Sequence, residues 1–204
     1  PAEPKKSLYY TADRMGPVEL ASCAFGQSSK ISYLEMAAAV CAVVNGGKLM
    51  QPYLVSDILA PDGSILRHNQ PVCRRQVIQP ATSATMREMM EAVVLYGGGR
   101  NAQIAGYRVG GKSGTSQKLD SADEKARIAS FVAVAPIDDP QFLCLVCLDE
   151  PHSWTTAGSL SAPVCAEVLE QTLVYKGVPR AADTGSADAQ AAALPADGDS
   201  FDGA

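Results

Sequence analysis

The residues best suited to chemistry lie between Gly106 and Gln117. The segment Gly106–Ser113, with the sequence GYRVGGKS, fits the pattern GxxxxGK[ST] of a phosphate-binding loop. Further on, the apolar run Leu143–Leu148 precedes Asp149 and Glu150, an order similar to the strand and acidic pair that hold magnesium in ATPases. One hypothesis is therefore a nucleotide-binding site (a P-loop) at residues 106–113.

The surrounding sequence argues against that hypothesis. A phosphate-binding loop joins a buried strand to a helix, whose N-terminus binds the phosphates. After Lys112 the chain continues as Ser113–Gln117 (SGTSQ), in which glycine and hydroxyl residues disfavour a helix start, and no apolar stripe follows up to Lys125. The preceding Asn101–Ala105 is too short and polar for a central parallel strand. We therefore do not expect an NTPase.

Grouped instead as Lys112-Ser113-Gly114-Thr115, the same residues form a different kind of site. On a strand edge this order offers a fixed cation, a hydroxyl donor and a backbone N–H in a row, and Gly114 allows a substrate backbone to approach closely. The order matches the K-T-G box that accompanies S-x-x-K and S-D-N in serine acyltransferases that recognise β-lactams. Four common residues recur by chance, so the tetrapeptide alone is a weak signal.

Three segments have the pattern of a helix. Ser32 and Glu35 form a capping box for a helix over about 33–44, which should be deeply buried and should stop at Asn45-Gly46-Gly47. The other two cover about 83–96, where we interpret the methionines as core filling, and about 162–175. The apolar positions of these two helices are Met86, Met89, Met90, Val93 and Val94, and Val164, Val168, Leu169 and Leu173.

Strands are expected between these helices, while residues 1–30 show little periodicity and should be extended or irregular. Turns are expected at Pro61-Asp62-Gly63 and at 136–140, and a polar loop at 120–125. Together the elements predict an α+β fold in which an antiparallel sheet is flanked by helices. The expected strands cover residues 54–60, 64–67, a short segment ending near Lys112, 128–135 and 142–148.

The composition limits the function classes. Five of the 22 acidic residues lie in segment 181–204, which has no basic residue, so residues 1–180 carry 17 acidic against 17 basic residues. A neutral body does not suggest nucleic-acid binding. Segment 181–204 has too few apolar residues to offset the entropy of ordering, so we expect a disordered tail behind one domain at residues 1–180. No apolar run approaches the roughly 20 residues of a membrane helix.

Two further patterns resemble sites but have simpler interpretations. Cys144 and Cys147 form a C-x-x-C inside a strand-like run, where their thiols should point to opposite faces, so we interpret them as small buried apolar residues and predict no metal site and no cofactor. The sequence leaves a disulfide elsewhere open. A Ser–His–Asp hydrolase would need a G-x-S-x-G elbow, which the chain lacks, so we interpret His68 and His152 as loop residues.

The flanks of the KSGT segment resemble the class B penicillin-binding proteins, and most of all the division and sporulation transpeptidases. The resemblance covers roughly residues 10–178, and it implies the fold of penicillin-binding proteins and serine β-lactamases. It also implies a peptidoglycan D,D-transpeptidase that acts by acyl transfer in cell-wall synthesis. The landmarks, in the same order as in the family, are Gly16–Ala21, Phe25–Gln27, Asn45–Gly47, Gln51–Val55, Gly111–Gln117, Ala129–Val132, Ala135-Pro136, Asp149–Pro151 and Ala162–Val164.

The resemblance also implies roles for individual residues. Lys112 would bind the carboxylate of the substrate or β-lactam and support proton transfer, and the Ser113 hydroxyl would contact that carboxylate. The Thr115 N–H would complete the oxyanion hole, which acts on charge that develops in the transition state. The ligands would be the peptidoglycan stem peptide and β-lactams. The substrate-binding positions would be Gly114, Ser116 and Gln117.

The chain departs from the family pattern at one point. No lysine has a serine three residues before it, and no asparagine has a serine or tyrosine two residues before it. We therefore expect the nucleophilic serine, its lysine base and the middle motif on an upstream part of the same protein, and we expect this chain alone to be inactive.

The resemblance further implies a place on the extracytoplasmic face of the bacterial cytoplasmic membrane. The anchor would be an upstream segment, and the partners would be the cell-wall synthesis machinery. A non-catalytic β-lactam sensor or scaffold of the same fold is an alternative. A serine β-lactamase is another, although the flanking landmarks favour a transpeptidase.

Overall fold

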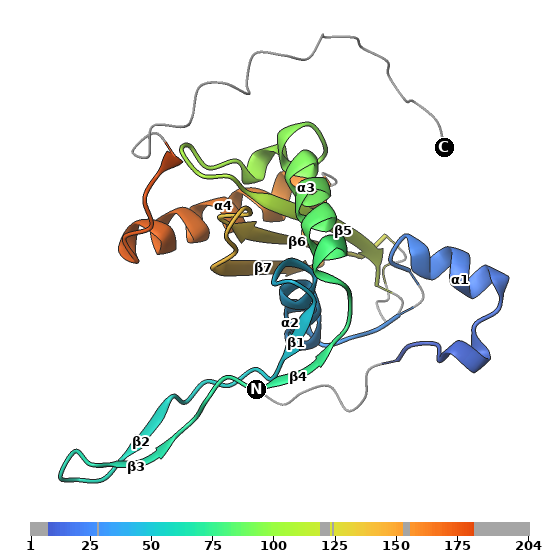
Figure 1. The fold of residues 1–204 in the computed structure, drawn as a ribbon. Helices are drawn as coiled ribbons and strands as arrows, with labels where there is room; N and C mark the ends of the chain where they lie inside the picture. The colour runs from blue at the N-terminus through green and yellow to red at the C-terminus, as the bar shows by residue number, and fades with distance from the viewer. Residues whose placement is uncertain (1–7, 28, 119–122, 124, 153–155, 182–204) are drawn as a thin grey trace.

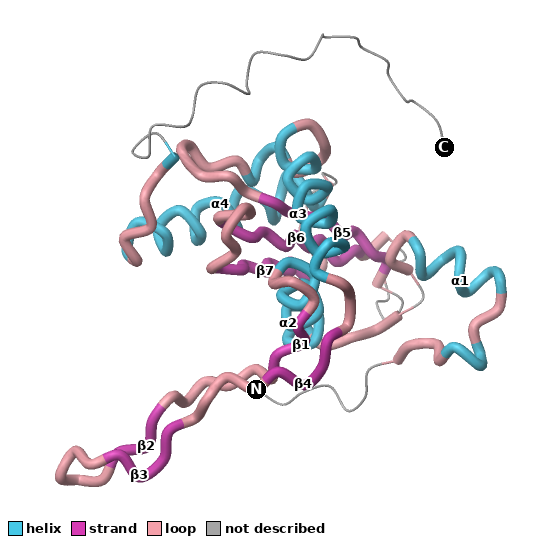
Figure 2. Tube along the Cα trace, in the orientation of Figure 1, coloured by secondary structure: helices cyan, strands magenta, loops and turns pink. Residues whose placement is uncertain are grey.

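The computed structural model of this chain describes residues 8–27, 29–118, 123, 125–152 and 156–181 (Figure 1). Figure 2 shows how helices and strands alternate along the chain. The α-helices are α1 (Pro17–Ala24), α2 (Tyr33–Val44), α3 (Pro80–Leu95) and α4 (Ala157–Tyr175), with short 3-10 turns η1 (Ala12–Arg14) and η2 (Arg100–Ala102). The strands are β1 (Lys48–Met50), β2 (Asp57–Leu59), β3 (Ile65–His68), β4 (Cys73–Gln76), β5 (Gly110–Gln117), β6 (Arg127–Ala135) and β7 (Phe142–Asp149).

The body of the molecule is an antiparallel sheet in the order β5-β6-β7, with helices on both faces (Figure 1). Neighbouring residues of β6 point to opposite faces, and they belong to different core clusters. Ala133 packs with Leu169 of α4, whereas Val134 packs with Val44 of α2 and Met90 of α3. The predicted α+β architecture, an antiparallel sheet flanked by helices, is confirmed.

Strands β6 and β7 confirm the two strands expected at 128–135 and 142–148 to within one residue. The central strand β6 is apolar and almost fully buried at its end, because it is covered on both faces. Cys144 on β7 hydrogen bonds the thiol of Cys165 on α4. Because Cys147 lies three residues further along the strand, it faces the other side of the sheet, as expected. Both thiols are half-buried, so the expectation of fully buried residues is only partly met.

Helix α4 begins five residues earlier than predicted. Its buried side consists mainly of small residues, which allow close packing on the sheet, and Val164 and Val168 of the predicted apolar side are exposed instead. At Gly158 a Cβ would lie 2.0 Å from the carbonyl oxygen of Gly98, so only glycine fits there. The buried positions of α4 are Ala157, Gly158, Ser161, Ala162, Cys165, Leu169 and Leu173.

Helix α3 begins three residues earlier than predicted, with Pro80 in its first turn. Proline is tolerated there because the N–H groups of the first turn have no acceptor within the helix. Met90 and Val94 are buried as expected, but Met89 is 58% exposed, because it lies on the opposite side of the helix from the sheet. Ser83 is buried, and its hydroxyl donates to Val43 O at 2.6 Å and accepts from Gly46 N at 3.0 Å.

Helix α2 has the predicted bounds, and the capping box between Ser32 and Glu35 is present. The expectation of deep burial was wrong for its first half. Among the residues that the structure describes, little covers this half, and its large apolar side chains are exposed. These side chains are Tyr33, Leu34 and Met36.

The N-terminal segment is more regular than predicted, because it contains η1 and α1. Pro17 stands in the first turn of α1, and no residue of this helix is buried. In Figure 1, α1 lies away from the body, beside the end of β5. Backbone bonds between Leu8 and Lys30, both 2.7 Å, close the segment into a loop.

The predicted hairpin around residues 61–63 is confirmed as β2–β3, although both strands are shorter than expected or shifted by a residue. No local pattern indicated β1 and β4, which pair between this hairpin and the body and carry the hairpin outward as an arm (Figure 1). Ala181 N donates to Gly106 O at 2.7 Å, which ties the last described residue to the body of the molecule. Apart from Ala181, the tail predicted at 181–204 lies outside the described residues. The described part of the chain has no helix with the length and apolarity to cross a membrane.

Candidate active-site edge

The six predicted site residues lie next to one another on β5. The strand begins at Gly110 and runs through Gln117. The expectation of a short strand that ends near Lys112 was wrong, because most of the strand follows that residue. Gly110 and Gly111 start the strand because the core leaves no room there. A Cβ would lie 2.6 Å from Ile137 at the first position and 2.6 Å from the ring of Phe131 at the second.

One edge of β5 is open among the described residues. Strand β6 pairs with the other edge, with Gly114 opposite Ser130 and Gln117 opposite Arg127. Beyond the strand, Lys118 N donates to Ala126 O at 3.0 Å in the same register. Because peptide groups alternate along a strand, the even-numbered residues of β5 point their N–H and C=O groups at β6. Those of the odd-numbered residues therefore face the open edge.

These outward-facing residues are Ser113, Thr115 and Gln117, so the Thr115 N–H is a free donor of the open edge. The ammonium of Lys112 lies at the same edge, because its Nζ donates to Ser113 O at 2.8 Å. Lys112 and Thr115 are exposed, and Ser113 is half-buried. A cation and a backbone N–H thus converge on one open stretch of strand, as an anionic ligand with a carbonyl group would require.

Ser130 of β6 is a neighbour of this stretch that the sequence did not single out. Its hydroxyl donates to Gly114 O at 3.1 Å, and a Cβ on Gly114 would lie 2.8 Å from the same hydroxyl. Glycine is therefore required at position 114 by packing inside the sheet as well as by any ligand. In the sequence Ser130 belonged to the landmark Ala129–Val132, but nothing there indicated a role at the site.

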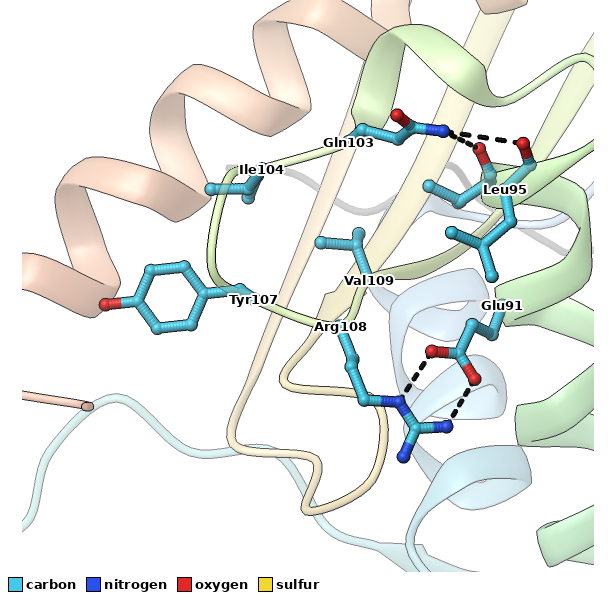
Figure 3. Close-up of a pocket in the computed structure, with 8 residues that line it drawn as sticks. Glu91, Leu95, Gln103, Ile104, Tyr107, Arg108 and Val109 are labelled. Atoms are coloured by element: carbon cyan, nitrogen blue, oxygen red, sulfur yellow. Dashed lines mark hydrogen bonds and ion pairs between the residues drawn. The ribbon is translucent and has the colours of Figure 1, made fainter. Parts of the chain in front are cut away.

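The segment 106–113 does not form a phosphate-binding loop. Gly106 lies in a turn closed by Tyr107 N and Ile104 O at 3.1 Å, and Lys112 and Ser113 continue into a strand instead of a helix. Arg108 is held against α3, where its Nε donates to Glu91 Oε1 at 2.7 Å (Figure 3). This ion pair raises the pKa of Arg108.

The acidic pair after β7 has a partner of its own. Lys118 Nζ lies 2.9 Å from both Asp149 Oδ2 and Glu150 Oε1, so the three side chains link the ends of β5 and β7 across β6. The hydrogen bond that Lys118 donates to Asp149, followed by the one that it donates to Glu150, raises the pKa of Lys118. Asp149 and Glu150 therefore link two strands through Lys118, and they do not face a glycine-rich phosphate loop.

The N-terminal loop and the outer end of β5 enclose a hollow of about 700 Å³. Ser116 and Gln117 line one side of it, and Gln27 and Lys30 line another. The open edge of β5 therefore leads into a space that is large enough for part of a peptide. Gly26, Gln27, Ser29 and Lys30 of the N-terminal loop therefore lie near the outer end of the KSGT strand.

The histidines take no part in this edge. His68 was expected in a loop but closes β3, where its Nδ1 lies 2.6 Å from Asp57 Oδ1, and this hydrogen bond lowers the pKa of Asp57. It stands on the outer arm, far along the chain from β5, and His152 lies in a bend. No group of three or more His, Cys, Asp or Glu residues in the described ranges is placed to hold a metal ion.

Comparison with known proteins finds relatives over most of the chain. The family model of the penicillin binding protein transpeptidase domain matches residues 4–170. Stage V sporulation protein D of Bacillus subtilis is 38% identical over 175 residues, which are 84% of this chain and 27% of that protein. Penicillin-binding protein PbpB of Mycolicibacterium smegmatis is 32% identical over 174 residues, 78% of this chain and 26% of that protein. The chain thus spans about a quarter of these relatives.

Solved structures give the same result. The apo transpeptidase domain of penicillin-binding protein 3 from Burkholderia pseudomallei matches with a TM-score of 0.71 and 31% identity, over 85% of this chain and 51% of that one. Penicillin-binding protein 3 of Mycobacterium tuberculosis in complex with aztreonam matches with a TM-score of 0.75 and 25% identity, over 85% and 42% of the two chains. The sequence and fold comparisons agree, and the chain belongs to the penicillin-binding protein transpeptidase family.

Proposed function

We propose that this chain supplies the third motif of a peptidoglycan D,D-transpeptidase. The observation that supports this most is the open edge of β5, where the Lys112 ammonium and the outward Thr115 N–H lie on one exposed stretch. Lys112 would attract the C-terminal carboxylate of a stem peptide or the carboxylate of a β-lactam, with help from the Ser113 hydroxyl. Gly114, Ser116 and Gln117 would lie along the bound peptide.

The reaction would be an acyl transfer in two steps. A serine hydroxyl attacks the carbonyl carbon of the D,D-peptide bond, its proton passes to a base, and the terminal residue leaves as an amine. The amine of a second stem peptide then attacks the acyl-enzyme and releases the serine. In both steps the carbonyl oxygen becomes an oxyanion, and the Thr115 N–H would be one of its two donors.

The serine that attacks is not among residues 1–204 in an S-x-x-K context. We propose that it, its lysine and the middle motif are on an upstream part of the same protein. The same upstream part would hold the protein at the extracytoplasmic face of the membrane, next to other cell-wall synthesis proteins.

Labelling with a fluorescent penicillin tests this proposal. The full-length protein should form a stoichiometric covalent adduct, and peptide mapping should find it on a serine outside residues 1–204. Under the same conditions the isolated chain should show no mass increase. An unlabelled full-length protein, or an adduct on the isolated chain, would contradict the proposal.

A second assay separates the transpeptidase from a β-lactam sensor of the same fold. The purified full-length protein is given a stem peptide that ends in D-alanyl-D-alanine, together with an amine acceptor. Release of D-alanine with formation of the cross-linked product supports the enzyme. Penicillin labelling without any release of D-alanine would assign the protein to the sensor class instead.

A further inference from the structure

We propose that Ser130 is a positioning residue for the oxyanion donor, because it fixes the peptide group that carries the Thr115 N–H. This inference rests on the proposed acyl transfer. It assigns a role to a residue of β6 that lies outside the KSGT segment and would not itself touch the substrate.

The peptide group in question joins Gly114 to Thr115. Its carbonyl points toward β6, as the register of the sheet requires, and there the Ser130 hydroxyl donates to it at 3.1 Å. The peptide is trans, so its N–H leaves on the opposite side, toward the open edge. By the same register, Gly114 O also accepts the ladder bond from Ser130 N–H, so the hydroxyl is a second donor to this carbonyl and further restrains the direction of the N–H end.

The need for such a bond follows from the position of the strand. An edge strand has a partner on one side only, and glycine at 114 gives the backbone more freedom than any other residue would. Gly114 has no side chain that could limit this freedom by packing. The Ser130 hydroxyl occupies the space where a Cβ would stand, 2.8 Å from the ideal Cβ position. It thus contacts Gly114 both at the carbonyl oxygen and on the face of the strand where a side chain would stand.

The hydroxyl has a second effect on the donor itself. A hydrogen bond accepted by a carbonyl polarises the amide, and the N–H at the other end becomes a better donor. Oxyanion stabilisation depends on donors that are already aligned when charge develops, so a small rotation of this peptide would lower the rate. The binding of the substrate carboxylate at Lys112 would not change, because that cation is held at Ser113 O.

The two constants of penicillin acylation separate these effects in the full-length protein. For Ser130→Ala we expect the acylation rate constant to fall about tenfold, less than the hundredfold or more of a deleted donor, because the Thr115 N–H is still present. The dissociation constant of the non-covalent benzylpenicillin complex should stay within about twofold. Ser130→Thr keeps the hydroxyl and should restore most of the rate.

Ser161→Ala is the matched control. The Ser161 hydroxyl also donates to a carbonyl of β6, that of Ala129 at 3.0 Å, but from α4 and on a peptide that carries no donor of the open edge. This variant should lower the melting temperature and leave the acylation rate constant unchanged.

Three results would overturn the inference: an unchanged rate constant in Ser130→Ala, an equally slow Ser130→Thr, or an equal loss in Ser161→Ala. Failure of the proposed function looks different, because then the unmodified protein is not acylated at all.

Discussion

Gly111 lies directly against the ring of Phe131, and a Cβ on this glycine would stand 2.6 Å from Phe131 Cε1 and 2.8 Å from Val132 O. The residue before Lys112, the lysine of the proposed motif, is thus fixed by the core of the sheet. Gly110 and Gly111 are both buried, whereas Gly114 of the same strand is exposed.

Gly111→Ala should therefore destabilise the protein. The backbone oxygen of Val132 cannot move away without breaking the ladder, so we expect a loss of about 1–3 kcal/mol, as for other overpacked sites. In a domain of this size that corresponds to a melting temperature lower by roughly 2–4 °C per kcal/mol. Gly98→Ala is the control, because nothing lies within 4 Å of its Cβ position. Equal melting temperatures of the two variants would contradict the packing account.

Ser83→Ala should also destabilise the protein, although the substitution is small. The Ser83 hydroxyl joins α3 to the end of α2, and its loss leaves the Val43 carbonyl and the Gly46 N–H without this partner in a buried place. Unsatisfied buried groups cost about 1–3 kcal/mol, which chemical denaturation can measure. Thr82→Ala, one residue earlier and exposed, should change stability by less than about 0.5 kcal/mol. A neutral Ser83→Ala would mean that water replaces the hydroxyl.

Magnesium and ATP should not stabilise the protein. Lys112 and Ser113 lie in a strand, and Asp149 and Glu150 are paired with Lys118. A ligand at 100 times its dissociation constant would add about 2.7 kcal/mol through mass action. At millimolar nucleotide we expect no shift in melting temperature. A clear upward shift would support the phosphate-loop hypothesis instead.

Truncation after Ala181 should leave the melting temperature unchanged. The composition of the remaining residues predicts no core, and they lie outside the described residues. The cut belongs after Ala181, because its N–H donates to Gly106 O and Arg180 binds Glu170 at 2.7 Å. A drop of several degrees in the truncated protein would show that the acidic segment docks on the domain.

Features with a local cause could be predicted from the sequence. The capping box at Ser32 and Glu35 depends on residues three apart, and the β6–β7 hairpin depends on one turn between two apolar runs. The KSGT segment was recognised for the same reason, because its residues are adjacent.

Features that depend on distant partners could not be predicted. The contact between Ser130 and Gly114 depends on the register of β5 against β6, which no local pattern fixes. The start of α4 was missed because its buried face uses Gly158, Ser161 and Ala162, which carry little hydrophobic signal. The exposure of Tyr33 and Leu34 on α2 was missed. An apolar pattern predicts that a helix face is buried, but it does not identify the segment that packs on that face.

Lys112→Ala in the full-length protein tests the strand edge most directly. The side chain is exposed, and among the described residues its ammonium bonds to the neighbouring carbonyl of Ser113, so the folded state should lose less than about 0.5 kcal/mol. The acylation rate with penicillin should fall by about a hundredfold or more, because a point charge is lost where the ligand carboxylate binds and where proton transfer is assisted. Lys48→Ala, an exposed lysine on β1, should leave both the rate and the melting temperature unchanged. A Lys112→Ala protein that melts normally and is acylated at the normal rate would remove the basis for assigning β5 as the active-site edge.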